Sequence, residues 1–228
     1  MSRPLLPAAL RQVWPNLPVL ALGSVLVAFA WGLARVAAAA VSWAGVVLIG
    51  LLVLPLLGAL LRGCLVLLTG DHFGIGTLVR TLPSSFARGL RICAPVTGVA
   101  LLGFAGTYAW QVSGSPWLLP SAALGSIITL GALYVGIVAL PYHVGGNGSW
   151  LRSWQVGLFV ATRNPVPVLA TMAAVVLAVL AAEHLSVALV LVLPAPVALV
   201  WASALRTATE HSRQMLAATS PQKGAAPR

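Results

Sequence analysis

The chain has 228 residues, of which 60% are hydrophobic and only 7% are charged, and its mean hydropathy is +1.00. Soluble domains carry about 25% charged residues, so this composition excludes a protein whose whole surface faces water. The formal charge of +10 comes from sparse bases between apolar runs, which disfavours nucleic-acid binding.

Six apolar runs organise the chain, each near the length of about 20 residues that a helix needs to cross a bilayer. They lie at 17–33, 42–68, 92–110, 118–140, 165–182 and 185–205. The fold class that we predict is all-α: a polytopic transmembrane helix bundle of about six membrane helices, with short cytoplasmic amphipathic helices. Residues 1–208 are expected to form one membrane domain, and 209–228 a basic, disordered cytoplasmic tail.

The first run also has features of a cleavable signal peptide, with Arg3 and Arg11 before it and the alanines of 37–40 after it. Five further apolar runs follow, so we favour an uncleaved membrane helix. The second run contains Arg62 and is longer than lipid requires. Its last two turns are therefore expected to reach the headgroups, with the arginine extended toward water.

The segment between the second and third runs, TLVRTLPSSFARGLR at 77–91, is amphipathic. Its apolar face carries four residues spaced by four: Leu78, Leu82, Phe86 and Leu90. Its opposite face carries three bases: Arg80, Arg88 and Arg91. This pattern is typical of a helix on the membrane surface, and Pro83 is expected to divide it. The segment is either a simple connector or a docking surface for a partner.

The third and fourth runs contain few polar side chains. Thr129 and Tyr134 are isolated, and hydroxyls in such helices usually bond to their own backbone. A transport path normally needs intramembrane charges or polar clusters, so an ion-coupled transporter acting alone is disfavoured. Small residues four apart, such as Ala94 with Gly98 and Ala122 with Ser126, predict close helix packing within the chain, with dimerisation as the alternative.

A second amphipathic segment lies at 149–162, where Trp150, Trp154 and Leu158 share a face. It is expected to break at Asn164, before the fifth membrane helix begins with a proline. The two amphipathic segments supply our candidate residues for contact with a partner or lipid: Arg80, Phe86, Arg88, Arg91, Trp150, Arg152 and Trp154.

The distribution of bases predicts the orientation, because cytoplasmic loops collect Lys and Arg. Twelve of the thirteen bases fall on one predicted side, and only Arg35 falls on the other. Both termini are therefore expected in the cytoplasm. All eight tryptophans lie near predicted helix ends, where the membrane interface is expected.

Catalytic and metal-binding patterns are missing. The three acids are Asp71, Glu183 and Glu210, and the predicted topology places Glu183 on the opposite side from the others. His72 and His143 have no partner that would complete a catalytic constellation. The cysteines, Cys64 and Cys93, belong to no CxxC or Cys/His cluster. We therefore expect no enzyme activity, cofactor or metal.

Three stretches carry a resemblance to a known family: LPLLGALLRGCLVLLTGD at 54–71, the segment 77–91, and SWQVGLFVATRNPVPVLATM at 153–172. With the helix spacing, they make roughly residues 15–208 resemble the YesL-like bacterial integral membrane proteins, whose biochemistry is unassigned. Genes of that family often lie beside carbohydrate ABC-transporter genes. The resemblance therefore implies an accessory role in sugar uptake, without supplying site residues.

These observations predict a multi-pass protein of the bacterial cytoplasmic membrane that acts as an accessory or interaction component of carbohydrate ABC-type transport. The expected partners are the lipid bilayer, anionic lipids at the cytoplasmic face and ABC-transporter permease components. Nucleic acid is not expected. The alternative is a transporter or permease subunit with its own substrate path, which predicts a polar cavity near Thr129, Tyr134 and the prolines.

Overall fold

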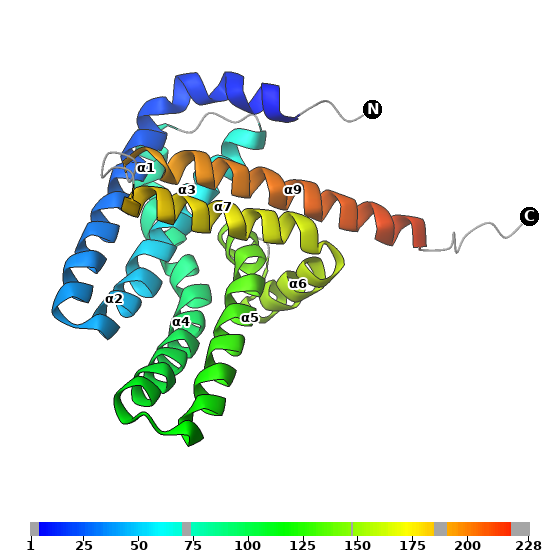
Figure 1. The fold of residues 1–228 in the computed structure, drawn as a ribbon. Coiled ribbons are helices and arrows are strands. Elements are labelled where there is room, and N and C mark those ends of the chain that lie inside the picture. Colours follow the sequence, from blue (N-terminus) through cyan, green and yellow to red (C-terminus); the bar gives the residue numbers. More distant parts are fainter. Residues whose placement is uncertain (1–4, 70–73, 147, 185–190, 220–228) are drawn as a thin grey trace, which may run out of the picture.

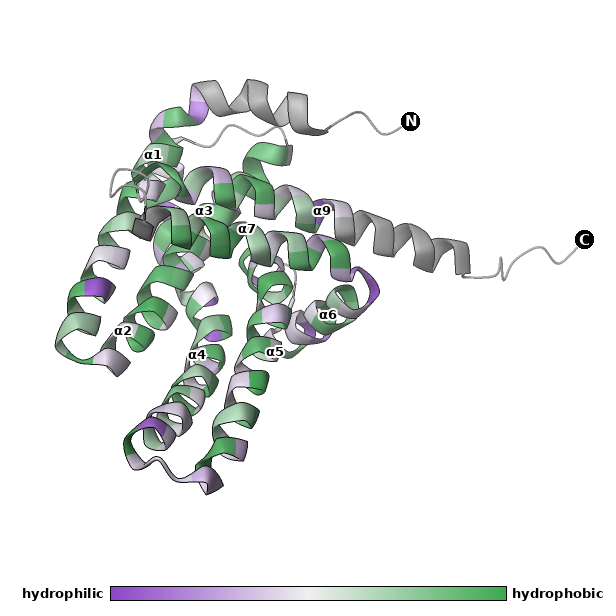
Figure 2. Cartoon of the chain, viewed as in Figure 1, coloured by the Kyte–Doolittle hydropathy of each residue, from purple (hydrophilic) through white to green (hydrophobic). Residues whose placement is uncertain are grey.

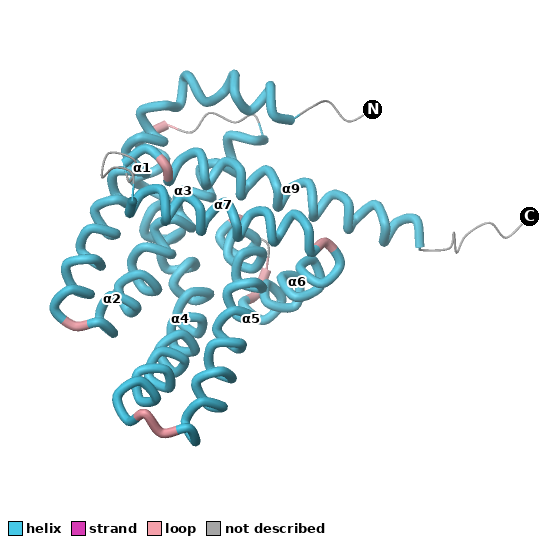
Figure 3. The backbone as a smooth tube through the Cα atoms, viewed as in Figure 1, coloured by secondary structure: helices cyan, strands magenta, loops and turns pink. Residues whose placement is uncertain are grey.

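The computed structural model describes residues 5–69, 74–146, 148–184 and 191–219, and within these ranges the regular structure is entirely helical (Figure 1). The first elements are α1 (Leu5–Ala40), α2 (Ser42–Leu48), the π-helix η1 (Ile49–Val53) and α3 (Leu54–Thr69). The central hairpin is made of α4 (Ile75–Ser113), the 3₁₀ turn η2 (Pro116–Leu118) and α5 (Leu119–Val144). The last elements are α6 (Trp150–Arg163), α7 (Pro165–His184) and α9 (Pro194–Thr219). Figure 3 shows how short the loops between the described helices are.

Four helical stretches of the described chain are long and apolar enough to cross a membrane: Pro15–Ala40, Ser42–Thr69, Ile75–Ser113 and Pro116–Val144. A fifth candidate arises if α6 and α7, which meet at a bend of 103°, count together as one broken span. The described part of the chain is therefore all helical and holds four or five candidate spans, where six were expected. The sixth predicted run begins at residues 185–190, which lie outside the described residues.

The described helices fall into two groups that run in different directions (Figure 1). The α1–α2 turn and the α4–α5 turn lie at the same end of the molecule, which we call the turn end. In the same view, α7 and α9 run across the direction of α4 and α5 instead of alongside them. α9 is helical through Thr219, so the expected disordered tail begins with helix, and residues 220–228 lie outside the described residues.

The amphipathic segment 77–91 is not a separate surface helix, because α4 continues without interruption through Pro83 and Pro95. Its buried stripe holds Leu78, Ser85 and Gly89 and then passes into the apolar part of the helix. Burial of α4 on both sides of Pro83, together with its packing against α3, offsets the backbone bond that proline removes. The expected break at Pro83 was therefore wrong, whereas the amphipathic character is present.

The second span contains a π-helical turn at Ile49–Val53. It lies where Gly50 meets α4, and a Cβ atom at this position would collide with the side chain of Thr97. A glycine is needed here because the Thr97 side chain occupies the space that a Cβ would fill. The π-turn therefore marks a tight contact between the second and third spans.

Many apolar side chains in the turn-end half of α4 and α5 are exposed, consistent with lipid as their surroundings. Figure 2 colours the chain by the hydropathy of each residue. The two helices meet at Gly103 and Gly125, where a Cβ at Gly125 would lie 2.8 Å from the Gly103 Cα. Of the predicted small pairs, Ala122 and Ser126 lie near this contact, whereas Ala94 and Gly98 are exposed. Close packing within the chain is thus confirmed, although partly through other residues than those predicted.

The predicted second amphipathic helix is confirmed as α6. Ser149 precedes it as N-cap, and its hydroxyl accepts a hydrogen bond from the Arg152 amide at 3.4 Å. The helix ends at Arg163, and α7 starts at Pro165 after the expected break at Asn164.

Candidate functional site

Polar side chains of α3, α4, α5 and α6 meet near the ends of these helices that lie away from the α4–α5 turn. We call this region the basic end and define it by four arginines: Arg62, Arg88, Arg91 and Arg152. Hydrogen bonds between side chains and neighbouring helices join α3 to α4, α5 to α6 and α6 to α4 in this region.

Arg62 connects α3 to α4. Its guanidinium Nη1 donates to the Ser85 hydroxyl at 2.9 Å and to the Ser84 hydroxyl at 3.4 Å. Ser85 is only 1% exposed, so the arginine is held against α4 rather than extended into water as the sequence suggested. The guanidinium of Arg88, one turn further along α4, is close enough to interact electrostatically with Arg62.

His143 connects α5 to α6. Its Nδ1 lies 2.9 Å from the Ser153 hydroxyl, and that hydroxyl donates to the Ser149 carbonyl at 3.0 Å. The imidazole is 5% exposed, and its Nε2 has no hydrogen-bond partner in the described part of the chain. Arg88 and Arg91 are close enough to act on this imidazole electrostatically.

Two tryptophans fix α6 on the bundle. The Trp150 indole N–H donates to the Arg91 carbonyl of α4 at 3.0 Å. Trp154 packs against the main core, and its buried Nε1 lacks a hydrogen-bond partner among the described residues. The inner face of α6 is made of small residues, because a Cβ at Gly157 would lie 3.1 Å from the Val135 carbonyl of α5.

The structure places the seven predicted contact residues in two environments. Exposed to the surroundings are Arg80, Arg91, Trp150 and Arg152. Partly buried are Phe86, Arg88 and Trp154. The contact between Arg91 and Trp150 brings the two predicted amphipathic segments together.

Sequence reasoning missed two cross-helix pairs of this region, which are Arg62 with Ser85 and His143 with Ser153. Only the spacing of small residues Ser153, Gly157 and Ala161, four apart on one face of α6, signalled that a helix would lie close by. Nothing in the sequence paired a serine of one segment with a histidine of another.

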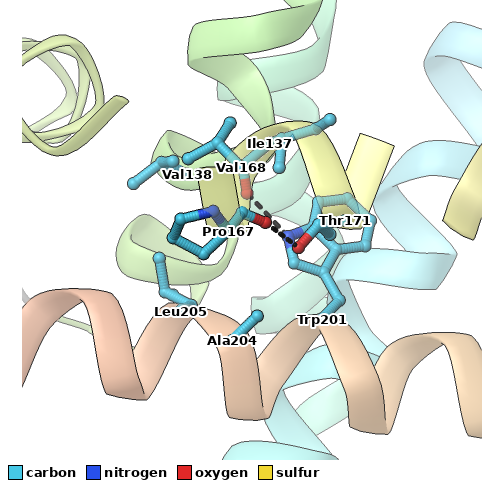
Figure 4. A pocket seen from close by; sticks show the side chains of 8 residues that line it. All are labelled: Ile137, Val138, Pro167, Val168, Thr171, Trp201, Ala204 and Leu205. Atoms are coloured by element: carbon cyan, nitrogen blue, oxygen red, sulfur yellow. Dashed lines mark hydrogen bonds between the residues drawn. The ribbon is translucent and has the colours of Figure 1, made fainter. Parts of the chain in front are cut away.

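An apolar cavity of about 160 Å³ lies deeper in the bundle, between α3, α4, α5, α7 and α9. Its walls are mainly aliphatic side chains, together with Cys93, Met172 and Trp201. A second cavity, drawn in Figure 4, holds only about 10 Å³, which is room for at most one water molecule. Figure 4 also shows the Trp201 indole, which is 4% exposed and donates to the Ile137 carbonyl at 2.7 Å.

Isolated hydroxyls in the spans bond to backbone, as the sequence predicted. Thr129 donates to the Gly125 carbonyl at 2.8 Å, and Thr171 donates to the Pro167 carbonyl at 2.8 Å. Tyr134 differs in detail, since its hydroxyl donates across to the Ala161 carbonyl at 2.8 Å. Neither of these two cavities is lined by Thr129 or Tyr134, so neither is the polar cavity that a substrate path near these residues would need.

The chemistry available at the basic end is recognition of anions, because guanidinium groups donate charge-assisted hydrogen bonds to phosphate and carboxylate oxygens. Cys64 and Cys93 are buried free thiols. No group of three or more His, Cys, Asp or Glu side chains that might hold a metal occurs within the ranges the structure describes. Comparison with protein-family models, with curated proteins and with solved structures finds no match to this chain.

Proposed function

We propose that this chain is a multi-pass interaction protein of the bacterial cytoplasmic membrane, which presents its basic end to anionic groups at the cytoplasmic surface. The four or five candidate spans support residence in a bilayer. The excess of bases on one predicted side supports the orientation with both termini inside. Under this proposal, the protein binds and positions other components and carries out no reaction itself.

The observation that carries the proposal is the bond between Trp150 and the Arg91 carbonyl. It links the start of α6 to α4 at Arg91, and we infer that the exposed bases of both helices form one surface there. Arg80 and Arg91 are eleven residues apart on α4, which places them within about 20° of each other on the helix. We call Arg80, Arg91 and Arg152 the basic surface.

The type of partner that we propose follows from the YesL-like resemblance, which implies an accessory role in carbohydrate ABC-type transport. Permease components of such a transporter are the protein partners, and anionic lipids are the membrane partners. A positively charged juxtamembrane surface attracts acidic protein segments and anionic headgroups alike.

A permease with its own sugar path is the weaker reading. The large cavity is lined by apolar side chains, and a sugar placed there would lose its hydrogen bonds to water without replacing them. The hydroxyls that might have lined a polar path are bonded to backbone carbonyls.

The test is quantitative co-purification after cross-linking in native membranes. The triple variant Arg80→Glu, Arg91→Glu, Arg152→Glu is compared with a matched variant carrying lysine at the same three positions. We expect recovery of ABC permease subunits to fall at least fivefold with glutamate and to be retained with lysine. Equal recovery from wild type and the glutamate variant, at equal membrane levels, would overturn the proposed role of the basic surface.

A further inference from the structure

The apolar cavity and the basic end share three helices. On each, a cavity-lining residue and a polar residue at the basic end are three to five positions apart in the sequence. The pairs are Leu57 and Arg62 on α3, Ile92 and Arg88 on α4, and Leu140 and His143 on α5. At 1.5 Å of rise per residue, each polar residue lies within about 8 Å of the cavity wall along its helix. Because α4 runs antiparallel to α3 and α5, all three polar residues lie on the same side of the cavity.

We propose that this arrangement is a binding site for one anionic phospholipid, with its phosphate at Arg62 and Arg88 and part of an acyl chain in the apolar cavity. The inference deepens the proposed function, on which it rests, by naming a specific ligand of the basic end. It concerns Arg62, Arg88 and the cavity, whereas partner docking was assigned to the exposed bases of the basic surface.

The charges of the site favour an anion. The positive charge of Arg88 lies close enough to interact electrostatically with Arg62, and the charges of Arg88 and Arg91 lie close enough to interact with His143. Like charges held together away from bulk water repel one another, and this repulsion grows as the local dielectric constant falls. Ser85 holds the Arg62 guanidinium beside α4, so a phosphate group reaching both arginines would neutralise charge that the fold already concentrates.

The polar groups beside the arginines include a histidine of α5. The Ser153 hydroxyl donates to the Ser149 carbonyl and therefore accepts from His143 Nδ1, which leaves Nε2 as an acceptor in the neutral imidazole. Because Nε2 is fully buried, a bound headgroup does not reach it, and we assign the lipid phosphate to the two arginines alone.

The cavity fits hydrocarbon. Its volume of about 160 Å³ is close to that of an engineered apolar cavity of about 150 Å³ that binds benzene, so it admits a stretch of several methylene groups. Its largely aliphatic lining offers dispersion contacts and almost no hydrogen bonds. An amphipathic anion with an acyl chain matches both the cavity and the charges beside it, whereas a free phosphate ion would leave the cavity unused.

The experiment is native mass spectrometry of the full chain in detergent, titrated with phosphatidylglycerol and with phosphatidylcholine carrying the same acyl chains. We expect phosphatidylglycerol to bind at least fivefold more tightly. The double variant Arg62→Gln, Arg88→Gln is expected to weaken this binding by about 25-fold, at roughly fivefold per arginine, and to abolish the preference. The matched control Arg80→Gln, an exposed base on the same helix, is expected to change binding less than twofold.

The acyl-chain part of the proposal is tested by filling the cavity. Gly136 lines the cavity, and a Cβ there would meet only Val96 at an ordinary distance of 3.7 Å, so Gly136→Leu is expected to fold. It should weaken binding of both lipids about tenfold, as displacement of one or two methylene groups would. Val175→Phe, another cavity-lining change, is the second variant if the first fails to fold.

Three results would overturn the lipid site. The first is equal affinity for the two lipids in the wild type, and the second is phosphatidylglycerol binding that neither the arginine variants nor the cavity variants weaken. The third is displacement of the lipid by millimolar inorganic phosphate, combined with unchanged lipid binding in the cavity variants. The last result would mark a site for free anions. None of these readouts involves a protein partner, so failure here is distinguishable from failure of partner recovery with the basic-surface variants.

Discussion

The two halves of α4 and α5 differ in how they satisfy polar groups. At the turn end, Thr107 and Ser126 donate to carbonyls of their own helix, and the helices meet through glycine. Thr129 bonds mainly to its own helix, with a longer second bond to the Val99 carbonyl of α4. At the basic end, polar side chains bond across helices instead, as Arg62 does to Ser85 and His143 to Ser153. In lipid, a polar group that bonds within its own helix costs little free energy to bury. A polar group that bonds to a neighbouring helix loses its hydrogen bond when that neighbour moves. The turn end is thus held by shape and the basic end by specific pairs.

The sharpest way to break the turn end is to add volume at its glycine contact. Gly103→Leu places a Cβ 2.9 Å from the Thr129 hydroxyl and 3.0 Å from the Gly125 carbonyl, so the hairpin must spread. We expect a loss of about 2–3 kcal/mol in the free energy of unfolding, measured by reversible unfolding in detergent. Gly98→Leu on the same helix is the control, because a Cβ there meets nothing within 4 Å. Equal losses in both variants would contradict the packing described here.

A medium effect is expected from removing a cross-helix partner at the basic end. Ser153→Ala leaves His143 Nδ1 buried without its hydrogen bond, since Ser153 is fully buried. We expect a loss of about 1–2 kcal/mol in the same unfolding measurement. Ser126→Ala, whose hydroxyl bonds only to the Ala122 carbonyl of its own helix, should cost a few tenths of a kcal/mol by comparison. If the two substitutions cost the same, the contrast between the two ends does not hold.

The smallest effect is expected at the exposed edge of the basic end. Trp150→Phe keeps an aromatic ring but removes the donor to the Arg91 carbonyl, and Trp150 is 41% exposed. Water can replace part of that bond, so the loss should be about 0.5–1 kcal/mol. We expect the substitution to speed amide hydrogen exchange in α6 relative to the wild type, and to do so more than in α5. Trp117→Phe, at 88% exposure in the turn, serves as the control and should leave exchange unchanged.

Sequence reasoning predicted the elements better than the contacts between them. Apolar length gave the start of α5, the amphipathic pattern gave the bounds of α6 to within a residue, and the Asn164 break appeared where proline chemistry placed it. Pro83 shows the limit, because a local helix breaker was outweighed by burial of the same stripe on both sides of it. Long-range pairs such as Arg62 with Ser85 depend on how helices rotate against each other, which periodicity within one segment does not determine.

Trp201 and Arg62 illustrate the same limit at single residues. A tryptophan near a helix end was expected at the membrane interface, yet Trp201 is buried and bonded to the Ile137 carbonyl. Arg62 was expected to extend toward water, yet serines of α4 hold its guanidinium against that helix, where the residue is partly buried. In both cases a polar atom found a partner on a neighbouring helix, and sequence spacing alone gives no signal for such a partner.

The most direct test of the account is the location of the two ends of the α4–α5 hairpin relative to the bilayer. Single cysteines are introduced by Ser115→Cys and by Ser149→Cys, with Cys64 and Cys93 replaced by alanine, and labelled with a membrane-impermeant maleimide. The account predicts that Ser115→Cys reacts in intact cells, whereas Ser149→Cys reacts only after the membrane is permeabilised. Labelling of both positions in intact cells, or the reverse pattern, would contradict a membrane bundle whose basic end faces the cytoplasm.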